Sequence, residues 1–234
     1  MVAPLFALVI ATALMTFSPN IKPATAYVKT PKGTIYWGGA GLDGDYIIPT
    51  LTAFRNAGIK NVSVGLTNTA TRSLPNKIGI LGIFFDTIRA GLTIRYEDDS
   101  DWTINSGMPN GEQFNLIGYS YGSLLAAQTA NFYAKNGVTV NNFILIASPI
   151  DAAFLNHLKN SKRINKVTVF NIKDDAIYAG ITQTGLMNPS AIQKLGKEMQ
   201  QNKGQGHFYF AHPVPDLPAR LKALTEQIAS TGVK

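Results

Sequence analysis

The sequence of 234 residues contains no cysteine, which excludes a thiol nucleophile, a cysteine-bound metal and any disulfide bond. Charged residues are also few, at 15% of the chain, so much of the surface must be neutral. There is no internal repeat and no low-complexity segment. A chain of this length can bury the core of one large domain without disulfides, so we expect a single domain over residues 27–234.

Acidic residues are outnumbered by basic ones, 14 against 21, and the formal net charge is +7. This balance suits an anionic surface such as phospholipid headgroups, and it would also suit nucleic acid. The densest basic patch contains no aromatic residue and is interpreted as a solvated face; it comprises Lys159, Lys162, Arg163 and Lys166. We therefore expect no nucleic-acid partner, whereas an anionic membrane surface and the oligomeric state stay open.

Residues 1–26 form an apolar segment in which no charged side chain precedes Lys22. Three interpretations stay open for it: a signal peptide cleaved near Ala26, a short membrane anchor, or a helix packed on the domain. A signal peptide usually begins with basic residues, and a spanning helix needs about 20 apolar residues, which this segment barely reaches. Secretion or membrane association of a bacterial type is the favoured location, and a cytoplasmic one stays open.

Apolar runs alternate with helical patterns along the rest of the chain. Strands are expected over 34–37, 61–65, 114–117, 143–147 and 167–171. Helices are expected from a cap at Asp45 to residue 57, and over 121–135, 151–162 and 217–228. Such alternation predicts an α/β fold with a mostly parallel sheet covered by helices on both faces. After Asp175 a polar helical stretch over 190–202 replaces any clear strand, so we expect a trimmed sheet.

The sequence Gly-Tyr-Ser-Tyr-Gly at residues 118–122 joins the strand expected at 114–117 to the helix expected at 121–135. A Gly-x-Ser-x-Gly pattern between a strand and a helix is typical of a nucleophile elbow, a strained turn that exposes a serine. The glycines are needed because larger side chains would clash where the strand and the helix pack closely. A helix-capping serine between incidental glycines is the less favoured alternative. We therefore predict that Ser120 is a nucleophile.

A serine hydroxyl needs a base to take its proton, and histidine commonly serves. Of the three histidines, His157 lies in an expected helix and is predicted to be a surface residue. His207 and His212 both follow the last expected strand and precede the last helix. His207 is favoured because its loop, 204–208, is rich in glycine and flexible enough to deliver an imidazole. His212 precedes Pro213 and is expected to cap or pack, so it is the alternate.

The base in turn needs a carboxylate to orient it, and in proteins with a nucleophile elbow the chain order is serine, acid, histidine. Two aspartates, Asp174 and Asp175, follow the strand expected at 167–171. Adjacent side chains point in different directions, so only one of the two is expected to reach the histidine. We favour Asp175 and keep Asp174 as the alternate.

An oxyanion hole requires backbone amides that face the reacting oxygen. One is expected from Tyr121, directly after the nucleophile, and a second from the Gly-Gly-Ala-Gly loop at 38–41, where Gly39 or Ala40 is the expected donor. The loop could instead cradle a phosphate. It lacks the Lys-Ser/Thr ending of a P-loop, however, and it is not Gly-x-Gly-x-x-Gly, so a nucleotide is not favoured.

Together these motifs resemble those of the α/β-hydrolase superfamily, specifically its lipases and esterases, over residues 34–234. The resemblance rests on residues 38–41, 118–122, 174–177 and 206–208. It implies the α/β-hydrolase fold and ester hydrolysis through an acyl-enzyme intermediate, without a metal or an organic cofactor. The loop at 38–41 lacks the histidine that commonly precedes the oxyanion glycines of this superfamily.

Two features favour a lipid ester as the substrate. Residues 78–92 are strongly apolar and lie where hydrolases carry caps or lids, although a core helix is equally compatible with them. The basic charge and the apolar first segment also suit an enzyme that meets an anionic membrane. We expect a lipase or phospholipase, including the secreted toxin-like lipases. The alternatives are a small-molecule carboxylesterase, a thioesterase, a peptidase, an acyltransferase, or a non-catalytic hydrolase-like binding protein.

Overall fold

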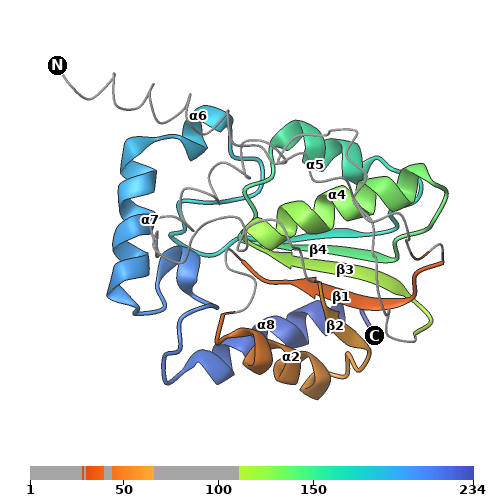
Figure 1. The fold of residues 1–234 in the computed structure, drawn as a ribbon, viewed down its shortest axis with the longest axis horizontal. Helices are drawn as coiled ribbons and strands as arrows, with labels where there is room; N and C mark the ends of the chain where they lie inside the picture. Colours follow the sequence, from red (N-terminus) through yellow and green to blue (C-terminus); the bar gives the residue numbers. More distant parts are fainter. Residues whose placement is uncertain (1–27, 29, 40–43, 66–110) are drawn as a thin grey trace.

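A computed structural model of the chain describes residues 28, 30–39, 44–65 and 111–234 (Figure 1). Its centre is a sheet of five strands, all parallel, in the order β2-β1-β3-β4-β5. The strands are β1 (Gly33–Trp37), β2 (Val62–Val64), β3 (Phe114–Tyr119), β4 (Asn142–Ile146) and β5 (Val167–Phe170). All five strands predicted from the sequence are therefore present, and the predicted α/β fold with a parallel sheet is confirmed.

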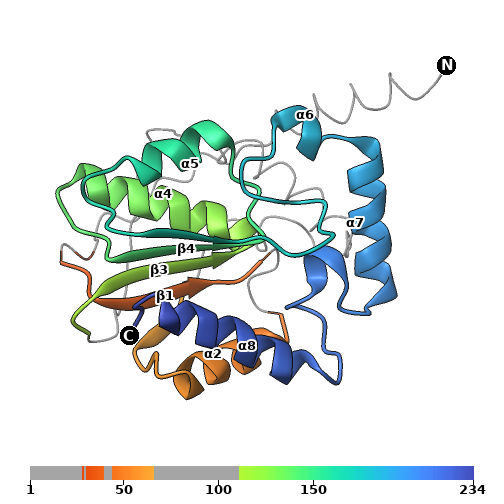
Figure 2. The same cartoon turned by 180° about the vertical axis from the view of Figure 1, so that it is seen from behind.

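Helices cover both faces of this sheet. They are α2 (Ile47–Asn56), α4 (Tyr121–Lys135), α5 (Ala152–Lys159), α6 (Gln183–Leu186), α7 (Pro189–Gln201) and α8 (Leu217–Ser230), with one 3₁₀ turn, η1 (Gly206–Phe208). Helices α2 and α8 pack together on one face, and α4 and α5 lie on the other (Figures 1 and 2). Helix α7 stands beside the sheet rather than on a face of it, and it packs against η1 and α6.

Alternate side chains of each strand enter two different apolar clusters. On β3, Leu116 packs in the cluster under α4 and α5, whereas Ile117 packs in the cluster under α2 and α8. Both side chains are fully buried. Burial of one such side chain stabilises the fold by about 1.5–3 kcal/mol. Burial on both faces explains why the strands are continuous apolar runs rather than alternating ones.

Local capping explains where several helices begin, and it overturns one expectation. Asp151 caps α5, since its Oδ1 accepts hydrogen bonds from the N–H groups of Ala153 at 2.8 Å and Phe154 at 3.1 Å. Asp45, by contrast, does not cap α2, and the prediction that it would is wrong. The residue before α2 is Tyr46, no side-chain cap bond forms there, and Asp45 is exposed to solvent.

The order of the strands places a topological switch point beside β1. From β1 the chain passes through α2 to β2 on one side, while β3 pairs with the other side of β1 and is followed by α4 on the opposite face. At such a switch point the connections leave in opposite directions, and the carboxyl ends of the two strands border a space suited to ligands. Trp37 of β1 is in register with Gly118 of β3, so this point lies at the Gly-x-Ser-x-Gly sequence.

Several predictions concern segments outside the described residues. These are the apolar segment 1–26, the lid or core helix at 78–92, and Ala40 of the glycine-rich loop. Within the ranges that the structure describes, no helix has both the length and the apolar character required to cross a membrane.

Candidate active site

Ser120 occupies the sharp turn between β3 and α4. Its backbone angles are φ 53° and ψ −125°, a conformation that L-residues rarely adopt and that costs about 1–3 kcal/mol. The turn is held by its neighbours: Ser120 N–H donates to the carbonyl oxygen of Ile146 at 2.9 Å, and Ser123 N–H donates to that of Ser120 at 3.0 Å. The strained turn predicted for the Gly-x-Ser-x-Gly sequence is thus present.

The two glycines beside Ser120 allow the backbone to pack without any intervening side chain. A Cβ atom on Gly118 would lie 2.3 Å from the Cα of Ser123, in the first turn of α4. A Cβ atom on Gly122 would lie 2.0 Å from the carbonyl oxygen of Gly38, at the end of β1. Both contacts are with backbone that cannot move aside. The close packing of strand and helix expected from the sequence therefore requires glycine at both positions.

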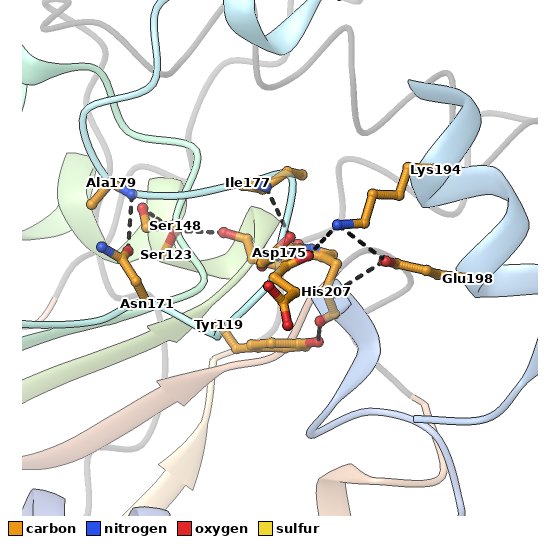
Figure 3. Close-up of polar contacts among 12 residues, drawn as sticks. Tyr119, Ser123, Ser148, Asn171, Asp175, Ile177, Ala179, Lys194, Glu198 and His207 are labelled. Atoms are coloured by element: carbon orange, nitrogen blue, oxygen red, sulfur yellow. Dashed lines mark hydrogen bonds and ion pairs between the residues drawn. The ribbon is translucent and has the colours of Figure 1, made fainter. Parts of the chain in front are cut away.

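Three side chains that are far apart in the sequence meet at this turn. Ser120 Oγ lies 2.6 Å from His207 Nε2, and His207 Nδ1 lies 2.8 Å from Asp175 Oδ2. The other carboxylate oxygen, Asp175 Oδ1, accepts a hydrogen bond from Ile177 N–H at 2.8 Å, which sets the direction of the carboxylate (Figure 3). Side-chain exposure is 6% for His207 and 0% for Asp175, so water is largely excluded from the pair.

The alternates named from the sequence lie outside this arrangement. Asp174 is exposed, has a positive φ of 61°, and presents its carbonyl oxygen to Lys194 Nζ. The ring of His212 stacks on Phe208, with ring centres 4.7 Å apart and planes at 3°. His212 Nδ1 accepts a hydrogen bond from Gly204 N–H at 3.2 Å. Burial lowers the pKa of His212, which favours the neutral ring that this bond requires.

The third histidine and the basic patch also lie where they were expected. His157 is exposed on α5, and its Nε2 lies 3.0 Å from Asn131 Oδ1. The four basic residues of the patch, Lys159, Lys162, Arg163 and Lys166, are all exposed. In the described part of the chain no group of three or more His, Asp or Glu side chains is arranged to hold a metal ion.

The backbone of His207 is held on both sides by residues that the sequence did not single out. The Tyr119 hydroxyl donates a hydrogen bond to the carbonyl oxygen of His207, and Glu198 Oε2 accepts one from its N–H at 3.2 Å (Figure 3). The Tyr119 ring also stacks on the imidazole, with centres 5.8 Å apart and planes at 16°. Burial raises the pKa of Tyr119 well above its usual value, so the phenol stays protonated and can donate.

The glycines of the loop that carries His207 predict a flexible segment, and in the structure several contacts hold its backbone. Gly204 and Gly206 adopt positive φ angles of 59° and 51°, and residues 206–208 form the turn η1. Arg220 of α8 donates hydrogen bonds to the carbonyl oxygens of Gly204 at 2.5 Å and Tyr209 at 3.1 Å. The glycines therefore allow a particular backbone path, which contacts with α8 and α7 then hold in place.

The expected oxyanion donors differ in their surroundings. Tyr121 is the first residue of α4, where the helix dipole favours negative charge. Gly39 lies beside the nucleophile, because a Cβ atom on it would be 3.3 Å from Ser120 Cβ. The N–H of Gly39 already donates to the Tyr46 hydroxyl at 2.6 Å, however, which occupies one of the two second donors expected from the sequence.

Comparison with known proteins adds no assignment. The sequence matches no protein-family model, and a search of curated proteins finds no match either. The fold and the site together define an α/β protein with a serine–histidine–aspartate arrangement at the carboxyl ends of parallel strands. The functional argument therefore rests on the geometry of these three residues.

Proposed function

We propose that this chain is a serine hydrolase of the α/β-hydrolase fold, which cleaves carboxylic esters through an acyl-enzyme intermediate. The observation that carries the proposal is the continuous contact from Ser120 Oγ through the His207 ring to Asp175, with separations of 2.6 and 2.8 Å. Ser120 also stands on a strained strand-to-helix turn, the position in which a nucleophile is exposed to substrate. A structural serine would need neither the strain nor a histidine–aspartate pair.

In the first half of the reaction, Ser120 Oγ attacks the ester carbonyl carbon while His207 Nε2 takes the hydroxyl proton. Asp175 stabilises the resulting imidazolium through the bond to Nδ1 and keeps the ring in the orientation that leaves Nε2 free to accept. The tetrahedral intermediate then expels the alcohol, which receives the proton from Nε2. The acyl group remains on Ser120.

In the second half, His207 Nε2 takes a proton from water, and the hydroxide formed attacks the acyl carbon. Collapse of this second intermediate returns the proton to Ser120 and releases the carboxylic acid. Negative charge on the carbonyl oxygen appears in both halves, and the backbone N–H of Tyr121 is the expected donor to it. Of the two second donors expected from the sequence, Gly39 N–H is engaged by Tyr46, and Ala40 lies outside the described residues.

A lipid ester, cleaved by a lipase or phospholipase activity, is the substrate class that we favour. Two large apolar side chains are exposed on segments that follow strand ends: Ile48, 76% exposed in the first turn of α2, and Tyr178, 49% exposed beyond Asp175. Apolar side chains that face solvent can contact an acyl chain or a membrane surface. The net charge of +7 would assist contact with anionic headgroups.

Labelling with a fluorophosphonate probe tests the central claim, because such probes react with activated serines. We expect wild-type protein to be labelled and Ser120→Ala to remain unlabelled. An unlabelled wild type would favour the alternative of a non-catalytic binding protein, and undiminished labelling of Ser120→Ala would exclude Ser120 as the nucleophile.

A substrate panel then tests the lipid class. Nitrophenyl esters of increasing acyl length should be cleaved with rising kcat/KM, and vesicles that contain anionic phospholipid should release fatty acid. Preference for acetyl esters together with inert vesicles would instead favour a small-molecule carboxylesterase, and faster cleavage of acyl thioesters a thioesterase.

A further inference from the structure

Helix α7 lies between the candidate acid and the candidate base in the sequence, and its side chains contact the backbone next to both. Glu198 Oε2 accepts a hydrogen bond from His207 N–H at 3.2 Å, and Lys194 Nζ donates one to the carbonyl oxygen of Asp174. Lys194 Nζ also lies 3.9 Å from Glu198 Oε1 (Figure 3). A polar connection therefore runs from the residue beside Asp175, through α7, to His207.

The backbone around Glu198 is shaped to accept its carboxylate. Gly206 has a φ of 51°, and a Cβ atom there would lie 2.2 Å from Glu198 Oε1. The Glu198 side chain is only 11% exposed, and burial raises its pKa above the usual value for glutamate. Helix stability does not explain this placement, because a lysine four residues before a glutamate is the weaker order for such a pair.

An apolar contact fixes α7 against the loop that carries the acid. Leu195, next to Lys194, packs in a small buried cluster with Ile177. Ile177 is the residue whose N–H orients the Asp175 carboxylate. The helix is thus docked on the turn that sets the direction of the acid, and its Glu198 reaches from there to the base.

The geometry points to Glu198 as a positioning residue for the proposed hydrolysis, with Lys194 as its partner. Glu198 holds the His207 backbone so that Nε2 stays at Ser120 Oγ, and its negative charge favours the imidazolium that forms when His207 takes the proton. Lys194 holds the backbone at Asp174, and so the turn to Asp175. This inference rests on the function proposed above.

Other charged or titratable groups share this environment. Among the described residues, Asp175 lies at the His207 ring, and Lys173 and Asp174 line an open hollow that Glu198 also lines. Tyr209 and, from α8, Arg220 line the same hollow, and Tyr119 of β3 stacks on the His207 ring. Arg220 is paired with Asp216 at 2.8 Å and lies over the Tyr209 ring. In the part of the chain that the structure describes, Lys194 is the cation in ion-pair contact with Glu198.

Four variants separate the carboxylate's hydrogen bond from its charge. Glu198→Gln keeps an acceptor but loses the charge, Glu198→Ala loses both, and Lys194→Met loses the donor to Asp174. Glu226→Gln is the matched control, because Glu226 forms a Lys–Glu pair of the same spacing, with Lys222 at 2.8 Å, on the exposed surface of α8.

The steady-state readout is kcat and KM for a nitrophenyl ester as a function of pH. We expect Glu198→Ala to lower kcat about 10- to 100-fold with little change in KM, because a misplaced base slows the chemistry more than binding. Lys194→Met should show a smaller loss in kcat. Glu198→Gln should shift the acidic limb of the kcat/KM profile to lower pH, since the imidazolium loses a stabilising charge. Glu226→Gln should match the wild type in all three quantities.

A titration of the His207 ring by NMR tests the same coupling without any substrate. The pH response of the His207 ring signals should differ between Glu198→Gln and the wild type, and it should be the same in Glu226→Gln as in the wild type. A protein that is not labelled by fluorophosphonate would count against the hydrolase proposal alone, because this titration does not depend on turnover.

Two results would overturn the inference. One is wild-type kcat in Glu198→Ala together with an unshifted His207 titration in Glu198→Gln. The other is an equal loss of kcat in both Glu198 variants with a lowered Tm and an unshifted titration, which would make Glu198 a purely structural residue.

Discussion

Ser120 and His207 are 2.6 Å apart at their closest atoms, yet the segments that carry them are held in different ways. The nucleophile turn lies between a central strand and a helix with twelve buried residues, and its glycines contact backbone directly. Residues 171–216, which carry the acid and the base, follow β5 in the sequence, and β5 is an edge strand of the sheet. Side-chain hydrogen bonds from Tyr119, Glu198 and Arg220 hold the His207 loop there.

This difference indicates that the two regions respond differently to mutation. Backbone packing in a core cannot adjust, so changes at the nucleophile turn should reduce the stability of the whole fold. Contacts by single side chains outside the sheet can be lost one at a time, so changes in the second region should alter the position of the base while the fold persists.

The largest effect is expected when His207 is replaced, and His212, the other histidine of the second region, serves as the comparison. His207→Ala should lower kcat/KM by about 10³-fold or more, because the serine then lacks a base. His212→Ala should lower it less than about tenfold, since His212 contacts Gly204 and Phe208 rather than Ser120. Assays of ester hydrolysis measure both. A larger loss in His212→Ala than in His207→Ala would reverse the assignment of the base.

The next effect concerns stability at the nucleophile turn. Gly122→Ala should lower the free energy of unfolding by about 3 kcal/mol or more, because its Cβ would lie 2.0 Å from the Gly38 carbonyl oxygen. Gly196→Ala on α7 is the control: among the described residues, no atom outside its own stretch of helix lies within 4 Å of the added Cβ, so it should stabilise by about 0.5–1 kcal/mol. Urea unfolding compares the two. Equal stabilities would contradict the rigid packing of the turn.

Replacement of a glycine in the second region should affect kcat more than stability. Gly206→Ala forces a positive φ on alanine and displaces the end of the Glu198 side chain, which should cost about 1–2 kcal/mol of stability. Its kcat should fall about tenfold or more, because His207 loses its N–H acceptor. A variant with normal kcat but the full loss of stability would mean that the base does not depend on this contact.

A smaller effect is expected where the two regions meet. Tyr119→Phe removes the donor to the His207 carbonyl oxygen but keeps the stacked ring, and it should cost about 1 kcal/mol of stability. The corresponding loss of kcat should be a few-fold, with KM unchanged. Tyr133→Phe, which removes a tyrosine bond to the Val28 carbonyl oxygen far from the site, is the control and should leave kcat unchanged.

The smallest effect is a pH dependence of stability. Burial lowers the pKa of His212 in the folded state, so the unfolded chain, with a histidine pKa of about 6.5, binds this proton more readily. The contribution of His212 to stability is therefore fully present above that pH and declines as the pH falls through the lowered pKa. Urea unfolding at pH 7.5 and pH 5 should show a smaller difference in His212→Gln than in the wild type. His157→Gln, at an exposed position, should leave the difference unchanged.

Much of the fold could be predicted because its signals are local. Apolar runs placed all five strands, and the helix expected over residues 121–135 has the observed bounds Tyr121–Lys135. The cap of α2 could not be predicted, because Asp45 has a suitable residue type but Tyr46 occupies the position before the helix and contacts the Gly39 amide. Capping depends on the path by which the chain enters a helix, and a tertiary contact decides that path here.

The choice among candidate site residues needed the three-dimensional arrangement. Asp174 and Asp175 are adjacent and chemically identical, so the preference for Asp175 had no physical ground in the sequence. The Ile177 N–H turns Asp175 toward His207, while Asp174 takes a left-handed conformation and faces solvent. Glu198 had no sequence signal, since a glutamate on a polar helix is ordinarily a solvated residue.

The sequence by itself determined the parallel α/β architecture and the strained serine turn, because strand periodicity, helix periodicity and the two glycines all act between near neighbours in the chain. Only the tertiary structure decided that Asp175 and His207 meet Ser120, that Tyr119 and Glu198 hold the base, and that Gly39 N–H is engaged by Tyr46. The contacts of Asp175, Glu198 and His207 join residues up to 88 positions apart, and their direction depends on how the segment after β5 folds back against the sheet.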